Sequence, residues 1–217
     1  MLLHGSCACA CKREHHDTTL VAVTGGPGGG KTAILEIARR SFCHHVAVLP
    51  EAASVVFGGG FPRHATPEGR RAAQRAIFHV QREVEALVLD EGRIGLALCD
   101  RGTIDGLAYW PGDPATYWEQ VGTTLEDELA RYAAVIHLET PDLARGYNHQ
   151  NPLRIETADE ARQIDRRIAA IWAQHPHLHA VPSTSDFVDK ATQALAIIRD
   201  LVPACCRGCA SDGGAAA

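Results

Sequence analysis

A glycine-rich stretch near the start of the chain limits its fold more than any other feature. Residues 21–32 read VAVTGGPGGGKT, in which four residues separate Gly25 from Gly30-Lys31-Thr32. This spacing is the pattern of a phosphate-binding loop, whose consecutive backbone N–H groups surround a polyphosphate. The apolar run Leu20–Thr24 precedes the glycines and a helix-forming run, 33–40, follows them. A simple connecting turn requires neither the full pattern nor this context, so the sequence predicts a strand, a phosphate-binding loop and a helix that together bind a nucleoside triphosphate.

Each residue type in the loop has its own task in such a site. Glycines let the main chain wrap closely around the anion, and the start of the following helix adds a partial positive charge. Lys31 is expected to reach the β- and γ-phosphates, and the Thr32 hydroxyl to ligate Mg²⁺. The predicted nucleotide-binding residues are Gly25, Gly26, Pro27, Gly28, Gly29, Gly30, Lys31, Thr32 and Ala33. ATP is the expected nucleotide, and GTP stays open although no guanine-reading Asn-Lys-x-Asp element is evident.

Size and charge exclude several other classes of protein. The chain has 217 residues, a mass of 23.3 kDa and a formal net charge of −5. This charge argues against general affinity for nucleic acids. No apolar run approaches the roughly twenty residues that span a bilayer, and the start of the chain lacks the layout of a secretory signal. We therefore expect a cytoplasmic protein with one α/β domain.

Five short apolar runs alternate with helical segments along the chain. The runs are Leu20–Thr24, His45–Leu49, Ile94–Cys99, Ala133–Leu138 and His179–Val181, and the helices are expected to follow at 33–41, 67–91, 104–110, 124–132, 157–172 and 186–201. This alternation predicts a three-layer α/β fold, in which a five-stranded parallel sheet is covered by helices on both faces. In the long second helix, helical spacing puts four apolar residues on one face, Ile77, Val80, Val84 and Leu87.

Acidic residues follow two of the predicted strands, at the sheet edge where ligands bind. Asp100 ends an apolar strand and is expected to hold Mg²⁺ directly or through water, as the cation requires hard oxygen ligands. Arg101 comes next and can neutralise charge on a transferring phosphoryl group. Glu51 follows the second strand and has two open interpretations: it orients and deprotonates an acceptor hydroxyl, or it caps the helix after Pro50.

Eight cysteines divide into two groups. Cys43 and Cys99 fall in or beside core segments, where a thiol behaves as a small hydrophobic group. The other six lie near the two ends, and these are Cys7, Cys9, Cys11, Cys205, Cys206 and Cys209. Their spacing allows a shared zinc or iron–sulfur site with His15 or His16 nearby. We favour flexible arms at 1–17 and 202–217 that carry reduced thiols, around a domain at 18–201.

A set of motifs is similar to a known family. The set comprises Gly25–Thr32, Pro50–Ala53, Asp100–Tyr109, Tyr147-Asn148, Asn151–Thr157, Trp172 and His175-Pro176-His177. Together these resemble the NadR-type ATPase/kinase domain, which is shared with TRPL-translocation-defect proteins, over residues 18–201. The resemblance implies a nucleoside-kinase-like P-loop NTPase core. It leaves the acceptor open, because the family includes a nicotinamide-riboside kinase, proteins without an assigned acceptor and animal members that bind GTP and phosphoinositides.

The segment 145–167 is the predicted lid. In small-molecule kinases a helical flap at this place carries arginines that close over the phosphates. Arg154 is the first candidate because it lies in the loop, and Arg162 is the second; Arg166 and Arg167 are expected on the surface. The predicted catalytic residues are therefore Lys31, Glu51, Asp100, Arg101, Arg154 and Arg162. The main hypothesis is a kinase that phosphorylates a small nucleoside-like acceptor, and the alternative is a slow NTPase or a nucleotide-switched protein that acts through a protein partner.

Overall fold

Parallel strands form the centre of the molecule. The computed structural model describes residues 9–141, 158–183 and 186–210. The sheet has the order β2-β3-β1-β4-β5, and all four strand pairs are parallel. The strands are β1 (Thr19–Thr24), β2 (Val46–Leu49), β3 (Leu96–Asp100), β4 (Ala134–Leu138) and β5 (Leu178–Val181). The predicted five-stranded parallel sheet is confirmed, and the strand bounds differ from the expected ones by at most two residues.

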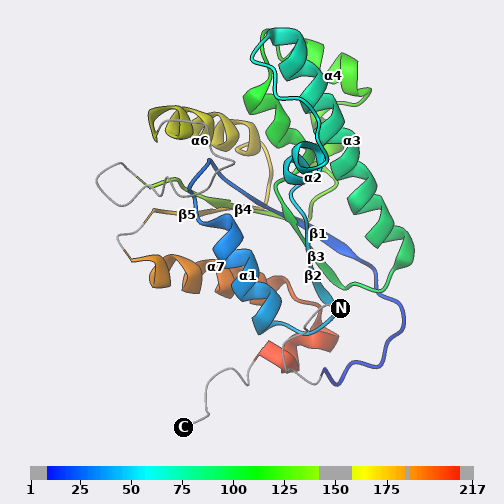
Figure 1. Ribbon diagram of the computed structural model, residues 1–217. Helices are drawn as coiled ribbons and strands as arrows, with labels where there is room; N and C mark the ends of the chain where they lie inside the picture. The colour runs from blue at the N-terminus through cyan, green and yellow to red at the C-terminus, as the bar shows by residue number, and fades with distance from the viewer. Residues whose placement is uncertain (1–8, 142–157, 184–185, 211–217) are drawn as a thin grey trace.

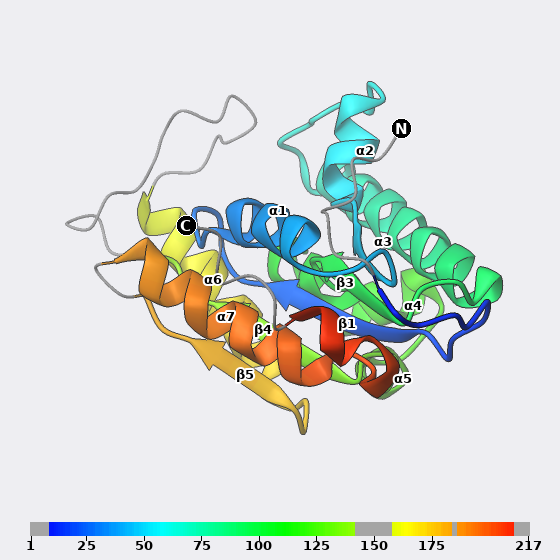
Figure 2. The ribbon, with the colours of Figure 1, turned by 90° about the horizontal axis from the view of Figure 1, so that it is seen from below.

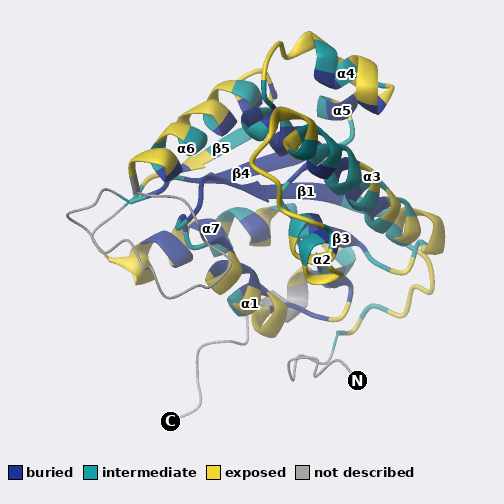
Figure 3. Cartoon of the chain, turned by 45° about the horizontal axis from the view of Figure 1, so that its top comes forward, coloured by how far each residue is buried: buried dark blue, intermediate teal, exposed yellow. Residues whose placement is uncertain are grey.

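Helices cover both faces of this sheet (Figure 1). On one face lie α1 (Lys31–Ser41) and α7 (Phe187–Leu201), and on the other lie α3 (Pro67–Glu91) and α6 (Ala158–Trp172). Because successive strand residues point to opposite faces, Val21 and Val23 pack with α1 and α7, whereas Leu20 and Ala22 pack with Trp172 of α6. Figure 2 shows α1 and α7 side by side along the sheet. In Figure 3 most of the sheet is buried between helices with exposed outer sides, whereas the edge strand β5 is partly exposed.

Shorter helices complete the fold. They are α2 (Ala52–Gly58), the 3-10 helix η1 (Thr103–Tyr109), α4 (Ala115–Val121), α5 (Leu125–Leu129) and the 3-10 helix η3 (Ala204–Ala210). The sequence patterns had not indicated α4 or η3. The long helix α3 begins as expected, since the Thr66 hydroxyl accepts a hydrogen bond of 3.2 Å from the Gly69 N–H and Pro67 occupies the first turn.

The buried face of α3 differs from the expected one. Leu87 is 58% exposed, whereas Gln81 and Glu85 are buried at 2% and 0%. Glu85 accepts hydrogen bonds from Gln81 (2.7 Å) and from the Tyr132 hydroxyl (2.8 Å), and it pairs with Arg131. These partners satisfy the buried carboxylate, so polar residues occupy a face that an apolar pattern alone places elsewhere.

Both chain ends also differ from the expected flexible arms, as far as the structure describes them. The N–H of His16 donates a hydrogen bond of 2.6 Å to the carbonyl of Gly92. Cys206 in η3 is buried, and Cys9, Cys11 and Cys205 pack against the core between α1, α7 and the sheet. Small apolar thiols hold parts of both segments against this end of the core, whereas residues 12–15 are exposed. The remaining parts of the predicted arms, 1–8 and 211–217, lie outside the described residues.

Within the described ranges, none of the helices combines the length and the apolar character needed to cross a membrane.

Candidate active site

The glycine-rich loop connects β1 to α1 at the carboxyl edge of the sheet. Gly25 has a φ of 133°, and a Cβ atom there would lie 2.2 Å from the carbonyl oxygen of Leu138. Only glycine fits such a position. Gly30, with a φ of 89°, is the N-cap of α1, and no side chain caps this helix end. The first N–H groups of α1 are therefore available for an anion, which the helix dipole also favours.

Lys31 folds back over the loop. Its ammonium group donates hydrogen bonds to the carbonyls of Gly25 (2.8 Å) and Gly26 (2.9 Å). Burial and the nearby charge of Arg101 lower the pKa of Lys31 to about 7, although Asp100 counteracts them. A triphosphate at the loop would supply the negative charge that this buried amine lacks.

Asp100 has the chemistry of a magnesium ligand. Burial raises the pKa of its carboxyl to about 6, because the nearby Lys31 charge only partly offsets desolvation. Within the part of the chain that the structure describes, its buried Oδ1 atom has no hydrogen-bond partner. Thr32 is exposed and lines the same cavity as Asp100. A buried oxygen without a partner, in a cavity that a hydroxyl-bearing residue also lines, suits Mg²⁺, which binds through one or two protein oxygens, phosphates and water.

Arg101 brings the two strand-end motifs together. Its Nε donates a hydrogen bond of 2.8 Å to Oε1 of Glu51, and its Nη1 lies 3.2 Å from the carbonyl oxygen of Gly25. The residue has a φ of 75°, an unusual backbone conformation for a non-glycine residue. Such conformations concentrate at functional sites, where surrounding contacts hold them. The strand-two acid, the arginine and the loop therefore converge on one place.

Glu51 is ionised in this arrangement. Burial alone would raise the pKa of Glu51, but the charge of Arg101 and a hydrogen bond of 2.6 Å from the Ser54 hydroxyl lower it overall. Glu51 occupies the N-cap position of α2, yet its side chain makes no capping hydrogen bond. The sequence had left open whether Glu51 acts on an acceptor or caps this helix, and the hydrogen bond that side-chain capping requires is not formed.

Asp105 is a site residue that sequence reasoning missed. Its Oδ2 accepts from the Thr24 hydroxyl at 2.5 Å and lies 3.3 Å from Nη1 of Arg101, while its Oδ1 accepts from Nε1 of Trp172 at 2.7 Å. Asp105 therefore contacts the guanidinium at Nη1, whereas Glu51 contacts it at Nε. Asp105 lies four residues after Arg101, and a second acid at that spacing was the only available signal.

Two further residues anchor the phosphate-binding loop from distant helices. Asp165 of α6 accepts hydrogen bonds from the N–H groups of Gly26 (2.6 Å) and Thr140 (3.2 Å). Lys190 of α7 donates to the carbonyls of Gly29 (2.8 Å) and Glu139 (2.6 Å). Neither residue belongs to a recognisable local motif, so only the tertiary fold reveals them.

A large cavity connects the loop with a second, partly aromatic region. Its volume is about 1090 Å³. Residues 27–33, Glu51, Asp100 and Arg101 line one part of it. The second part is lined by Phe57, Arg63, Gln74, Phe78, Tyr109 and Trp110. Ligand pockets usually measure about 300–1000 Å³, so the cavity has room for a nucleotide and a second molecule.

The structure describes two of the arginines of the predicted lid, Arg162 and Arg167, but not Arg154. Arg154 and most of the segment 145–167 lie outside the described residues. Arg162 is paired with Asp159, one turn earlier on α6, and it is not among the residues that line the cavity. Arg167 is exposed, as expected, and it also lines the cavity and donates to the carbonyl of Ala108 at 3.4 Å.

Comparison with known proteins places this site in a wider context. Residues 20–188 match the sequence model of a family described as "AAA domain". No curated protein is significantly similar in sequence. Two similar solved structures are NadR proteins. One, in complex with NAD and AMP-PNP, has a TM-score of 0.56 at 14% identity, and the match covers 88% of this chain and 50% of that one. The other, in complex with NR, has a TM-score of 0.64 at 13% identity, and the match covers 86% of this chain and 52% of that one. The chain thus spans about half the length of these proteins and shares their fold.

Proposed function

The chain belongs to the AAA domain family of P-loop proteins, and from this premise we propose that it is a kinase. In this proposal it transfers the γ-phosphoryl group of ATP to a hydroxyl group of a small nucleoside-like acceptor, with Mg²⁺. The observation that carries the proposal is the contact of 2.8 Å between Arg101 and Glu51 beside the phosphate-binding loop. A protein that only hydrolyses ATP can use an acid to orient water, but it has no need of space for a second molecule beside that acid.

The second part of the cavity supports a ring-containing acceptor. Phe57, Tyr109 and Trp110 offer apolar ring surfaces, and the guanidinium of Arg63 lies 4.0 Å from the centre of the Phe57 ring. Aromatic rings stack on flat molecules such as bases. Gln74 and Gln81 lie nearby and could bind hydroxyl groups of a sugar. One NadR structure contains AMP-PNP and the other contains NR, and ligands of these kinds are consistent with such a site.

Each proposed residue has one role in the transfer. Lys31 and Arg101 would hold the γ-phosphoryl oxygens, together with Arg154 if the lid closes, and spread their negative charge. The acceptor oxygen bonds to the γ-phosphorus, the bond between that phosphorus and the bridging oxygen breaks, and ADP leaves with the electron pair. The ionised Glu51 orients the acceptor hydroxyl and takes its proton. Thr32 and Asp100 would hold Mg²⁺, which neutralises charge on the phosphate oxygens when bound.

A direct assay tests this proposal. The purified protein is incubated with Mg²⁺, ATP and a panel of purine, pyrimidine and pyridine nucleosides, and ADP and phosphorylated acceptor are both measured. We expect one acceptor to accelerate ADP formation at least about a hundredfold over the reaction with water. If no acceptor accelerates it, and a partner protein is instead retained only with ATP or GTP bound, the nucleotide-switched alternative replaces the kinase.

A further inference from the structure

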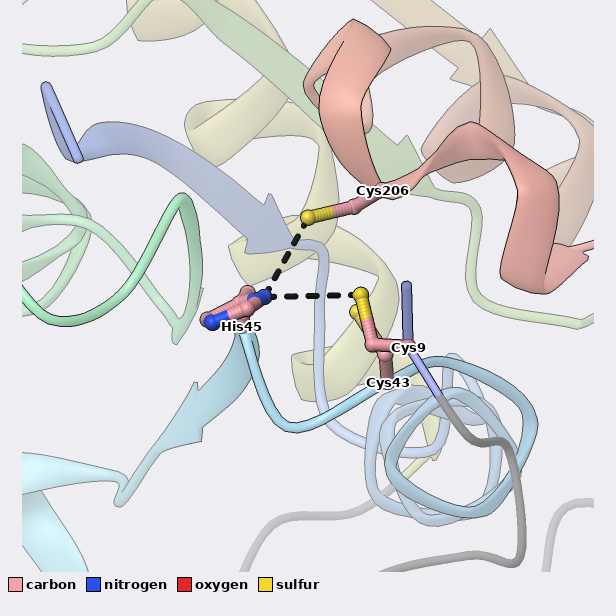
Figure 4. Close-up of side chains that lie close together, drawn as sticks. All are labelled: Cys9, Cys43, His45 and Cys206. Atoms are coloured by element: carbon pink, nitrogen blue, oxygen red, sulfur yellow. Dashed lines mark hydrogen bonds between the residues drawn. The ribbon is translucent and has the colours of Figure 1, made fainter. Parts of the chain in front are cut away.

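Four metal-binding side chains meet at the end of the domain away from the nucleotide cavity. They are Cys9 from the N-terminal segment, Cys43 and His45 from the connection between α1 and β2, and Cys206 from η3 (Figure 4). Their three sulfur atoms and one nitrogen all lie within 4.8 Å of one another. The two ends of the chain thus meet at a point between them where one ion could bind.

The distances between these atoms fit one tetrahedral ion. The Nδ1 atom of His45 lies 3.3 Å from the sulfur of Cys206 and 3.6 Å from the sulfur of Cys9. In a tetrahedral zinc site with ordinary Zn–S and Zn–N bonds, neighbouring donor atoms are about 3.5–3.8 Å apart. The separations of 3.3 and 3.6 Å are close to this range.

Ordinary packing of thiols does not account for this convergence. A buried cysteine can serve as a small apolar residue, but here one imidazole nitrogen faces two sulfurs from opposite ends of the chain. A single ring nitrogen has one lone pair or one N–H and serves one of them well. A cation at the centre satisfies all the donors together. The backbone of His45 is also fixed, because its carbonyl accepts from the N–H groups of Gly95 (2.8 Å) and Leu96 (3.0 Å).

We propose that Cys9, Cys43, His45 and Cys206 bind one structural Zn²⁺ ion. Three soft thiolates and an imidazole in a tetrahedron are the ligands that Zn²⁺ prefers. Cys43, His45 and Cys206 are at most 5% exposed. Four protein ligands leave no position for water or substrate, so the site is closed and has a structural role.

A second group of donors nearby is the less suitable one. Cys11 and His16 could form a tetrad with the same His45 and Cys206. The sulfur of Cys11 lies 3.9 Å from Nε2 of His16, which is longer than the contacts of the first group. His45 and Cys206 are shared, and each contributes one ligand atom, so the two tetrads exclude each other. The shorter distances and the third thiolate favour the first.

The proposed zinc fastens both chain ends to the domain. Cys43 lies just beyond the end of α1, whose eleven residues extend about 16 Å from the phosphate-binding loop. None of the four ligands lines the nucleotide cavity. Loss of zinc should therefore loosen the N-terminal segment and η3 and lower thermal stability, while nucleotide binding persists.

The test measures zinc in the full-length protein, purified under reducing conditions without a metal-binding tag. We expect about one zinc per chain by mass spectrometry. Replacement of zinc by Co²⁺ should give visible bands of a tetrahedral ion and a thiolate-to-cobalt charge-transfer band. X-ray absorption should show three sulfur neighbours and one nitrogen. Chains that remain without zinc after incubation with it, or that contain a disulfide between these cysteines, would overturn the proposal.

Variants identify the ligands. Cys9→Ser and Cys206→Ser should each reduce the zinc content at least about tenfold after dialysis against a chelator. His45→Cys should keep the zinc and change its neighbours to four sulfurs, which also shows that the variant folds. Cys205→Ser is the matched control: its sulfur lies 3.7 Å from that of Cys206 but outside the tetrad, so zinc should be retained. If Cys11→Ser loses zinc and Cys9→Ser keeps it, the assigned ligand set is wrong.

Discussion

The guanidinium of Arg101 and the carboxylate of Glu51 form an ion pair with a separation of 2.8 Å, although the two residues are fifty positions apart in the sequence. Their side chains are 15% and 30% exposed. Each group partly neutralises the other in the free protein. A bound triphosphate would attract the arginine, and Glu51 could then turn toward an acceptor. In the proposed kinase, the pair would therefore link the binding of phosphate to the release of a base.

The substitution Glu51→Gln tests this role. It keeps the size of the side chain and removes the charge that accepts the proton. We expect the rate of phosphotransfer to fall by about a hundredfold or more, while the affinity for ATP, measured by calorimetry, changes by less than about threefold. Ser54→Ala removes only the other partner of Glu51 and should retain most of the activity. Equal activity of Glu51→Gln and the unchanged protein would exclude Glu51 as the base.

Binding of ATP should take up a proton at Lys31. Burial lowers the pKa of the free Lys31 amine to about 7, so most molecules carry a neutral amine at pH 8. A triphosphate raises this pKa, because it stabilises the ammonium form. Calorimetry in two buffers with different ionisation enthalpies should therefore reveal uptake of nearly one proton at pH 8 and much less at pH 6. Thr32→Ala should weaken Mg²⁺ binding and retain the uptake. An absence of uptake at pH 8 would contradict the assignment.

Asp165 should stabilise the loop it contacts. Its carboxylate accepts from the N–H of Gly26 at 2.6 Å and is 13% exposed. Asp165→Asn should lower the free energy of unfolding by about 1.5–3 kcal/mol, the usual contribution of a hydrogen bond to a charged group. The control Asp159→Asn, on the same helix and 70% exposed, should change it by less than about 0.5 kcal/mol. Urea unfolding measures both.

The pH dependence of the stability lost in Asp165→Asn follows from the direction in which folding shifts the pKa of Asp165. Burial alone would raise the pKa of Asp165, but hydrogen bonds from His137 and Gly26 lower it below 3.8 overall. The charge therefore stabilises the fold at neutral pH, and this stabilisation disappears as the pH falls below 3.8 toward the folded pKa. The difference in the free energy of unfolding between the unchanged protein and Asp165→Asn should stay constant from pH 8 to about pH 5 and shrink only below pH 5. A gap that closes near pH 6 would point to another group.

Local sequence patterns predicted the parts of the site that depend on neighbouring residues. The loop from Gly25 to Thr32, with its strand and helix, follows from glycine spacing and β-branched residues. The acids Glu51 and Asp100 could be placed at one edge because parallel strands present their carboxyl ends together. The contact of Glu51 with Arg101 could not be predicted, since it requires the turn after β3 to adopt the unusual φ of 75°.

Tertiary contacts decided the features that the sequence did not indicate. Asp165 and Lys190 reach the loop only because α6 and α7 dock beside it. The apolar pattern of α3 predicted that Leu87 would be buried, but Glu85 is buried instead. Its hydrogen-bond partners Tyr132 and Arg131 lie more than forty residues away in the sequence. The cysteines near the ends gave no unique metal pattern, since Cys43 and His45, their proposed partners in the zinc site, lie in the interior of the sequence.

Asp100 should be unfavourable for folding and necessary for binding. Its folded pKa of about 6 exceeds the ordinary value of 3.8, mainly because burial disfavours the charge. For an acid whose pKa rises on folding, the folded state holds more protons than the unfolded state between these values, so stability falls as the pH rises from 4 to 6. At pH 8 the free protein is then destabilised by up to about 3 kcal/mol. Asp100→Asn removes this charge and should unfold at a higher urea concentration than the unchanged protein.

The gain in stability of Asp100→Asn should disappear below about pH 4, where the Asp100 carboxyl of the unchanged protein is protonated in both the folded and the unfolded state. The control Asp90→Asn, at an exposed position on α3, should show no comparable gain. The same Asp100→Asn variant should lose the contribution of Mg²⁺ to ATP affinity, because its amide is a weaker ligand than a carboxylate. Adding Mg²⁺ and ATP should therefore stabilise the unchanged protein far more than the variant and reverse their order of stability. If Asp100→Asn is instead less stable at pH 8 and still responds to Mg²⁺, the residue supports the fold and another group holds the metal.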